Sequence, residues 1–191
     1  MSDILTIDTA VGITKEKPVE LLPLFTDALP MLSEVVPEYV GPLPNPQMTE
    51  LVNRMKYTMR EHAGLGLSAT QCGVFQRVFV IGFKDFTMTC INPKIISSSE
   101  KMEKDDEGCL SFPGLMFKIS RSSSIDVEFT TENGEVKNMT LTGVTARCFQ
   151  HELDHLNGIK FTEKVGPTTL MMARQKQAKL IKKISRIQKK L

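Results

Sequence analysis

His151-Glu152-Leu153-Asp154-His155 stands at the centre of this sequence, with Gln150 before it and Leu156-Asn157-Gly158 after it. The stretch has the form H-E-x-x-H. Residues four apart share one face of a helix, so the two histidines can reach the same divalent metal ion. The glutamate then lies beside the ion, where a carboxylate can accept a proton from water that the metal activates. The pattern predicts a metal-binding helix, and a surface helix that happens to carry two histidines is the plainer alternative.

A third ligand must complete such a site, because catalytic zinc sites use three protein ligands and keep one position open. Phe161 stands where the third histidine of the extended protease motif H-E-x-x-H-x-x-G-x-x-H would be. Glu163 is the only acidic residue after Asp154, and the last helical segment contains none. The third ligand is therefore expected upstream of His151.

Cys109 is the candidate for that ligand, within Glu107-Gly108-Cys109-Leu110-Ser111. A thiolate suits a borderline-soft cation, and one cysteine with two histidines is a known catalytic zinc set. The glycine before it and Pro113-Gly114 after it predict a tight turn that exposes the sulfur and nearby backbone N–H groups. The alternative is a buried structural cysteine, which is the usual state of a free cysteine.

A glycine-rich segment, Gly64-Leu65-Gly66-Leu67-Ser68-Ala69-Thr70-Gln71, is the third informative stretch and is expected to be a loop. It lacks the Gly-Lys-Ser/Thr ending of a phosphate loop, and no strand is expected before it. Taken in order, G-L-G-L-S-A-T-Q, E-G-C-L-S and Q-H-E-L-D-H resemble the three signature motifs of peptide deformylase. The resemblance covers roughly residues 46 to 165 and, more loosely, the start and the C-terminal helix.

The resemblance implies an activity and a metal. Peptide deformylases remove the formyl group from the N-terminal formyl-methionine of nascent bacterial-type polypeptides. Their usual metal is Fe(II), and zinc, nickel or cobalt can occupy the site. The implied metal ligands are Cys109, His151 and His155. Formamide hydrolysis suits such a site, because a metal lowers the pKa of bound water to about 7.

The remaining roles also follow from the resemblance. Glu152 would be the general acid/base, which takes a proton from water and delivers it to the leaving amine. Gln71 and the backbone N–H of Leu110 would form an oxyanion hole that stabilises the tetrahedral intermediate without adding net charge. The segment that lies along the substrate and pairs its backbone with an extended peptide would consist of Gly64, Leu65 and Gly66.

Three residues need comment beside this resemblance. Ser68 occupies a position that is commonly alanine in the family, a small change that should be tolerated. Arg147 lies four residues before His151, on the ligand-bearing face, where the family generally has an apolar residue near the methionine pocket. We expect its stem to line this substrate-binding pocket while its head turns outward, and contact with a carboxylate is the alternative. For Arg121 the resemblance implies that it braces the metal loop through Glu107, and an ordinary surface residue of a strand is the alternative.

Composition limits the class of protein. A chain of 191 residues with 41% hydrophobic and 24% charged residues is expected to form one soluble globular domain. It has no apolar run of membrane length, and its opening residues lack the pattern of a secretion signal. Its four cysteines form no C-x-x-C pair, which favours a reducing cytosol, so we expect a cytoplasmic monomer without membrane contact. Cys148 is expected in the core rather than at the metal.

These patterns predict an α+β fold in which small mixed or antiparallel sheets pack around the central metal-binding helix. Residues 20–44 are expected to form an irregular loop. A helix should then be capped by Asn45, start at Pro46, carry a methionine stripe in the core and end at Gly64. The other expected elements are strands over 77–83 and 88–96, a hairpin around Asn133-Gly134, and the metal-binding helix from about Gly143.

The C-terminal segment differs in charge from the rest of the chain. Residues 168–191 contain eight Lys/Arg and no acid, giving +8, whereas the first 167 residues sum to −6. We expect residues 1–167 to form the catalytic part and residues 168–191 to form a basic amphipathic helix of the same domain. This helix is either a solvated helix packed on the domain or a contact for RNA phosphates. The resemblance implies docking at the ribosome, and a membrane surface is a third option.

Two classes of function remain. One is a metallohydrolase that acts on formyl-methionyl peptides. The other is a noncatalytic protein that keeps a metal-stabilised fold and binds ribosomes or RNA through its basic helix. Glu152 and Gln71 oppose the second, because a structural metal would need neither. A zinc peptidase that cuts internal bonds is a third alternative, which the missing downstream ligand opposes.

Overall fold

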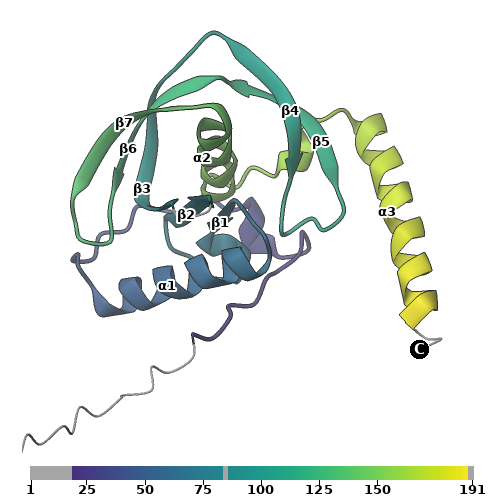
Figure 1. Ribbon diagram of the computed structural model, residues 1–191, viewed down its shortest axis with the longest axis horizontal. Coiled ribbons are helices and arrows are strands. Elements are labelled where there is room, and N and C mark those ends of the chain that lie inside the picture. Colours follow the sequence, from purple (N-terminus) through teal and green to yellow (C-terminus); the bar gives the residue numbers. More distant parts are fainter. Residues whose placement is uncertain (1–18, 84–85, 189–191) are drawn as a thin grey trace, which may run out of the picture.

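The structure, a computed structural model, describes residues 19–83 and 86–188 and contains two antiparallel sheets in that part of the chain (Figure 1). The larger sheet has the order β1-β2-β3-β6-β7, with strands β1 (Gly66–Ser68), β2 (Val78–Phe83), β3 (Phe86–Ser98), β6 (Ser124–Thr130) and β7 (Val136–Thr142). The smaller sheet pairs β4 (Met102–Gly108) with β5 (Met116–Ser122). The helices are α1 (Pro46–Glu61), α2 (Gly143–Leu156) and α3 (Pro167–Gln188), and 3-10 turns cover Pro30–Ser33, Ala69–Cys72 and Phe161–Lys164. The expected α+β class is confirmed.

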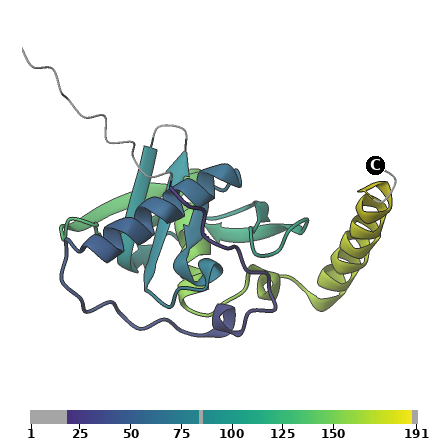
Figure 2. The ribbon, with the colours of Figure 1, turned by 90° about the horizontal axis from the view of Figure 1, so that it is seen from below.

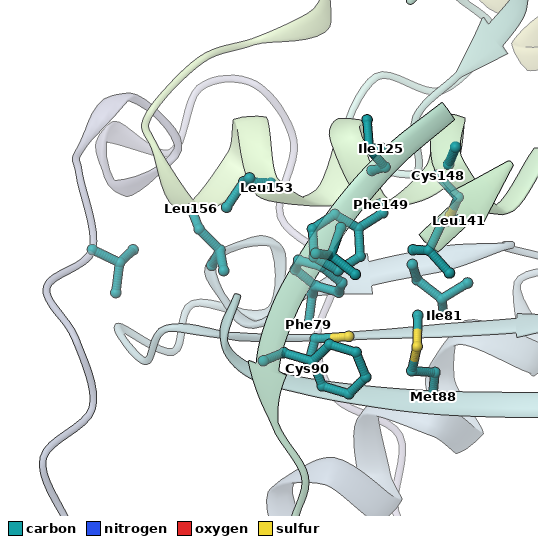
Figure 3. Packing of buried hydrophobic residues seen from close by; sticks show 14 residues of the cluster. Phe79, Ile81, Met88, Cys90, Ile125, Leu141, Cys148, Phe149, Leu153 and Leu156 are labelled. Atoms are coloured by element: carbon teal, nitrogen blue, oxygen red, sulfur yellow. The ribbon is translucent and has the colours of Figure 1, made fainter. Parts of the chain in front are cut away.

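Helix α2 lies at the centre of the molecule, against one face of the larger sheet (Figure 1). Phe149 of α2 packs edge-on against Phe79 of β2, with ring centroids 5.0 Å apart. Leu153 and Leu156 continue this apolar face, and Cys148 belongs to the same cluster, as expected for a core residue (Figure 3). Burial of this face fixes how α2 is rotated about its axis, and helical geometry then turns its histidines to the opposite side.

Helix α1 covers the other face of the sheet with the predicted methionine stripe. Alternate residues of β2 point to the two sides, Phe79 and Ile81 toward α2 and Val78 and Val80 toward α1. The side chain of Asn45 accepts from the backbone N–H of residue 47 at 2.9 Å, which confirms the predicted cap. The buried residues of α1 are Met48, Val52, Met55, Thr58 and Met59.

The predicted end of α1 at Gly64 is three residues too long, because the helix ends at Glu61. Ala63 takes a left-handed conformation with φ 51°, and the N–H of Gly64 donates to Met59 O at 2.8 Å. This pair of features is the usual way in which a helix is closed by a left-handed residue followed by a backward hydrogen bond. The closure turns the chain directly into β1.

The strand predictions are confirmed for β2, β3 and the β6–β7 hairpin, and two features were not predicted. The glycine-rich segment contains strand β1, which lies at the edge of the larger sheet and pairs only with β2. The β4–β5 hairpin brackets the turn that carries Cys109. The expectation of a loop over residues 64–71 is therefore wrong for residues 66–68.

Helix α3 stands away from the body of the molecule (Figures 1 and 2). Its first turns pack against the body through Leu170 and Ala173, and every described side chain after Gln177 is exposed. No helix in the described ranges is both long enough and apolar enough to span a bilayer. The rest of the predicted apolar stripe, beyond residue 182, and the opening Met-Ser-Asp lie outside the residues or side chains described.

Candidate active site

Three side chains from two distant parts of the sequence meet beside α2. His151 and His155 are one helical turn apart on α2, and Cys109 follows the end of β4. Their ligand atoms all lie within 4.8 Å of one another, and Cys109 Sγ is 3.2 Å from His155 Nε2. Both histidines are buried and Cys109 is half-buried. The structure thus brings together the three residues predicted to bind a metal.

The chemistry of these donors fits a divalent transition metal. In a tetrahedral site with ordinary Zn–S and Zn–N bonds, a sulfur and a nitrogen ligand are separated by roughly 3.5 Å, close to the separation observed. Burial and the neighbouring His151 hold the pKa of His155 well below its usual range, so its imidazole is neutral, the form that binds metals. Three protein donors also leave one position open for a reactant.

Glu107 orients His151 from the side away from the other two donors. Its Oε2 lies 3.1 Å from His151 Nδ1, which leaves Nε2 for a metal. Burial would raise the pKa of Glu107, but hydrogen bonds from His151 and Arg121 lower it to about 2. Burial would likewise lower the pKa of His151, and its hydrogen bonds with Cys109 and Glu107 raise it to about 10. The pair therefore behaves as a strong charge-assisted contact in the protein chain alone.

Arg121 braces this arrangement through two carboxylates. It donates to both oxygens of Glu107 at 2.9 Å, the contact predicted from the sequence, and to Asp154 Oδ2 at 2.5 Å. Asp154 belongs to α2 and also pairs with Lys164. Buried charges need such compensation, because each would otherwise lose several kcal/mol of hydration. The network ties α2 to the β4–β5 hairpin.

Arg147 differs from its expected orientation. The prediction that its head turns outward is wrong, because it donates to Glu107 Oε1 at 2.7 Å and to the carbonyls of Ile119 and Glu103 at 2.8 and 2.6 Å. The carboxylate contact that was the alternative is the one observed. The buried charge of Glu107 attracts a second cation, and β4 and β5 supply the two carbonyls. The stem of Arg147 still borders the cleft described below.

Glu152 lies next to the three donors and is buried. Its Oε2 accepts a hydrogen bond from Ser68 Oγ at 2.8 Å. A Cβ at Gly66 would stand 2.4 Å from Glu152 Oε1, so only glycine permits this approach of strand and carboxylate. Burial raises the pKa of Glu152, and His151 and Ser68 oppose the rise. A carboxyl group tuned upward in this way can both accept and return a proton near neutral pH.

Gln71 approaches the same place from the turn after β1. Its Nε2 donates to Cys109 Sγ at 3.4 Å and to Ser111 Oγ at 3.2 Å, and its Oε1 accepts from Ser68 N at 2.9 Å. These contacts hold the amide N–H groups toward the cysteine. Among the hydrogen bonds of the described residues, none is donated by the backbone N–H of Leu110. Two uncharged donors are thus available near the three metal-binding side chains.

A cleft of about 560 Å³ opens onto this cluster. One wall is the segment Gly64, Leu65 and Gly66, which leads into the edge strand β1. The end of β4 with the Cys109 turn also lines the cleft, as do Cys148 and Arg147 of α2. The edge of β1 that no described strand covers is a natural template for an extended peptide.

Sequence reasoning missed three partners of the site. Ser111 holds Gln71, Asp154 holds Arg121, and Ser68 holds Glu152. Asp154 lies three residues after His151 and so had a recognisable helical position. The contacts of Ser111 and Ser68 join residues that are 40 and 84 positions apart in the chain, and no local pattern predicts them.

The comparisons with known proteins agree with this geometry. The sequence model of the polypeptide deformylase family matches residues 22–170 of this chain. A peptide deformylase of Thermotoga petrophila is 36% identical over 139 residues, which are 73% of this chain and 85% of that protein.

Solved structures give the same result. A peptide deformylase from Legionella pneumophila superposes with a TM-score of 0.80 at 30% identity, covering 87% of this chain and 99% of that one. A Met-Ala-Ser-bound class I type b peptide deformylase from Acinetobacter baumannii superposes with a TM-score of 0.73 at 29% identity, covering 77% and 99%.

Proposed function

The chain belongs to the polypeptide deformylase family, a family of enzymes, and we propose that it removes the formyl group from the N-terminal formyl-methionine of nascent polypeptides. The observation that carries the proposal is the cluster of Cys109, His151 and His155 at a cleft, with Glu152 beside it. The Met-Ala-Ser peptide bound to the Acinetobacter protein supports it further, because that peptide begins with the methionine that deformylation exposes.

One divalent metal would be held by Cys109, His151 and His155, and we propose Fe(II) as the native ion, with zinc, nickel or cobalt able to replace it. When bound, the metal would supply a Lewis acid that activates water at neutral pH and polarises the formyl oxygen. The thiolate adds negative charge that a third histidine would lack, which tunes both functions. The neutral state of His155 and the Glu107 contact of His151 support these ligand assignments.

Glu152 would act as general acid/base. Its carboxylate accepts a proton from the water that attacks the formyl carbon, and returns this proton to the amine nitrogen as the C–N bond breaks. The products are formate and a peptide with a free amino terminus. Support comes from the buried position of the carboxylate and its pKa, which burial raises.

Gln71 and the N–H of Leu110 would stabilise the oxyanion that forms on the formyl oxygen. The Gln71 amide is already held toward Cys109, so little reorganisation is required. The backbone of Gly64, Leu65 and Gly66 would pair with the extended peptide, since β1 has a free edge. Arg147 would shape the floor of the pocket through its stem rather than touch the substrate with its charge.

Formate release tests this proposal directly. The protein, purified anaerobically with Fe(II), is given formyl-Met-Ala-Ser, and formate and free amine are measured together. We expect both in equal amounts, and no cleavage of internal bonds in an acetylated Met-Ala-Ser control of the same length. Absence of formate at full metal occupancy would favour the noncatalytic binding protein, and cleavage of the control peptide would favour a peptidase.

We further propose that the protein works as a cytosolic monomer and that α3 attaches it to ribosomes, where formylated chains emerge. The support is the segregation of charge, +8 in residues 168–191 against −6 elsewhere. Residues 168–188 of this segment belong to α3, which projects from the body (Figure 2). The four cysteines are all free, which suits a reducing compartment. Binding through phosphates should weaken steeply as salt rises, because each neutralised phosphate releases counterions.

A pair of charge-matched variants tests the attachment. Lys176, Lys179 and Lys182 are exposed on α3, and changing all three to Glu should abolish cosedimentation with ribosomes at low salt. A control variant changes three exposed lysines of the body to Glu, namely Lys94, Lys101 and Lys137. Equal cosedimentation of the two variants would show that α3 is simply a solvated helix.

A further inference from the structure

Among the described residues, the hydrogen bonds that the Ser68 hydroxyl donates go only to Glu152. Ser68 is fully buried, and its Oγ lies 2.8 Å from Glu152 Oε2 and 2.9 Å from the backbone carbonyl of the same residue. Among the hydrogen bonds of the described residues, no other reaches the Glu152 carboxylate. We propose that Ser68 is a positioning residue of the proposed reaction, whose hydroxyl fixes Oε2 of Glu152 so that Oε1 is presented to the cleft.

The geometry of β1 supports this assignment. Residues 66 and 68 are two apart on a strand and so face the same side, toward α2, whereas Leu67 points into the core beneath α1. Oε1 lies against Gly66, where an added Cβ would come within 2.4 Å, and Oε2 lies against Ser68. The strand therefore distinguishes the two carboxylate oxygens, and both Gly66 and Glu152 line the cleft.

A hydroxyl suits this position because the proposed reaction needs Glu152 both without and with a proton. While Glu152 is a carboxylate, Ser68 donates to Oε2 in a charge-assisted hydrogen bond. While Glu152 holds the proton, that proton lies on Oε1, so Oε2 is the carbonyl oxygen of a neutral carboxyl group and Ser68 can go on donating to it. One contact can therefore keep the same side-chain orientation in both halves of the proton transfer.

Ser68 also touches Gln71, and this contact must be separated from the one to Glu152. It is the backbone N–H of Ser68 that donates to Gln71 Oε1, at 2.9 Å, and an alanine would keep this bond. Ser68→Ala also removes the capping contact in which the Ser68 side chain accepts from the backbone N–H of Gln71, so the orientation of Glu152 in a crystal structure, rather than kcat alone, separates the two contacts. Thr70 offers a matched control, because its hydroxyl is buried two residues away and has no partner among the described residues.

The test compares Ser68→Ala, Ser68→Thr and Thr70→Val, all loaded with zinc. We expect Ser68→Ala to keep full metal stoichiometry and KM but to lose about 10-fold in kcat, since hydrogen bonds to charged groups are of that order. Ser68→Thr should restore kcat, and Thr70→Val should match the parent. If threonine does not fit the buried site, cysteine, a weak donor of similar size, should give an intermediate kcat.

A crystal structure of the zinc-loaded Ser68→Ala protein supplies a readout that does not depend on turnover. We expect the Glu152 carboxylate to rotate or occupy two orientations while the three ligand side chains stay in place. The inference is overturned if kcat is unchanged, if metal content falls in parallel with kcat, or if Glu152 keeps its parental orientation. The inference rests on the proposed function. A parent protein that releases no formate would overturn that function alone. The orientation of Glu152 in the Ser68→Ala crystal structure would still show whether Ser68 positions it.

Discussion

Helices α2 and α3 are both amphipathic, but they differ in which side chains are buried and which are exposed. On α2 the ionisable groups are buried or half-buried, and Asp154, His151 and Glu152 each have a partner on another element. On α3 it is the apolar groups that are left in solvent, since Met171, Met172, Leu180 and Ile181 are each at least half exposed. Burial is thus concentrated where the chemistry is proposed to occur, and the helix proposed to meet a partner is left uncovered.

The difference shows what a buried polar group requires. Each charge of α2 is balanced within a network that spans the Cys109 turn and the β4–β5 hairpin, so removal of one member leaves others uncompensated. Apart from Arg174, which pairs with Asp27, the described charged side chains of α3 are exposed to solvent, and salt screens them. Four predictions test this contrast, and they run from the largest expected effect to the smallest.

The largest effect on the site at α2 is expected from removal of the Cys109 thiolate. In Cys109→Ala we expect metal content to fall from one ion per chain to nearly none, with formate release below detection, because two histidines alone bind a divalent ion weakly. Metal analysis under anaerobic conditions measures the first effect. A parental metal content in this variant would place the third ligand elsewhere.

The next largest effect is expected at the proposed general acid/base. Glu152→Gln preserves shape and leaves the three donors untouched, so the fold and the metal should remain while turnover falls by about 100- to 10,000-fold. Steady-state formate release by the metal-loaded variant measures this loss. Near-normal turnover at full metal occupancy would rule out the assigned role.

Two arginine variants compare the helices directly. Arg121→Ala leaves the buried carboxylates of Glu107 and Asp154 partly uncompensated and should lower the free energy of unfolding by about 3–5 kcal/mol. Arg174→Ala on α3 removes an ion pair with Asp27 whose partners are 37% and 34% exposed, so about 0–1 kcal/mol is expected. Urea unfolding of both proteins with saturating metal gives the two values, and similar losses would refute the contrast.

The smallest effect is expected at the exposed end of α3. Leu180→Gln and Ile181→Gln should each change the free energy of unfolding by no more than about 0.5 kcal/mol, because both side chains are half exposed. Thermal and urea unfolding measure this. A loss well above about 1 kcal/mol would mean that these side chains are covered in the isolated protein in solution.

The sequence predicted those parts of the site that follow local rules. The spacing of His151 and His155, the cap at Asn45 and the turn at Asn133-Gly134 each depend on a few neighbouring residues, and each is found in the structure. Strand β4 could not be predicted in this way, because its residues 103–107 are all charged and the strand shows no apolar alternation; six of its seven residues are exposed.

The predicted orientation of Arg147 was wrong for a related reason. Its position on α2 was predicted, but the carboxylate that turns it inward comes from β4, forty residues earlier in the chain. Long-range electrostatic contacts of this kind depend on the tertiary fold rather than on spacing. Whether α3 packs on the body could not be predicted for the same reason. An apolar stripe on a helix indicates which face would pack, but not whether another element lies against it.

The three-residue strand β1 has a consequence for how this protein can change over evolutionary time. Gly66 and Ser68 face Glu152 while Leu67 fills the core below α1, so the two sides of the strand carry different duties. Inserting or deleting a single residue would exchange the two sides, placing a leucine against the carboxylate and a glycine or serine in the core. A side chain at residue 66 would displace the carboxylate, and a change in the length of the segment would displace every side chain of the strand.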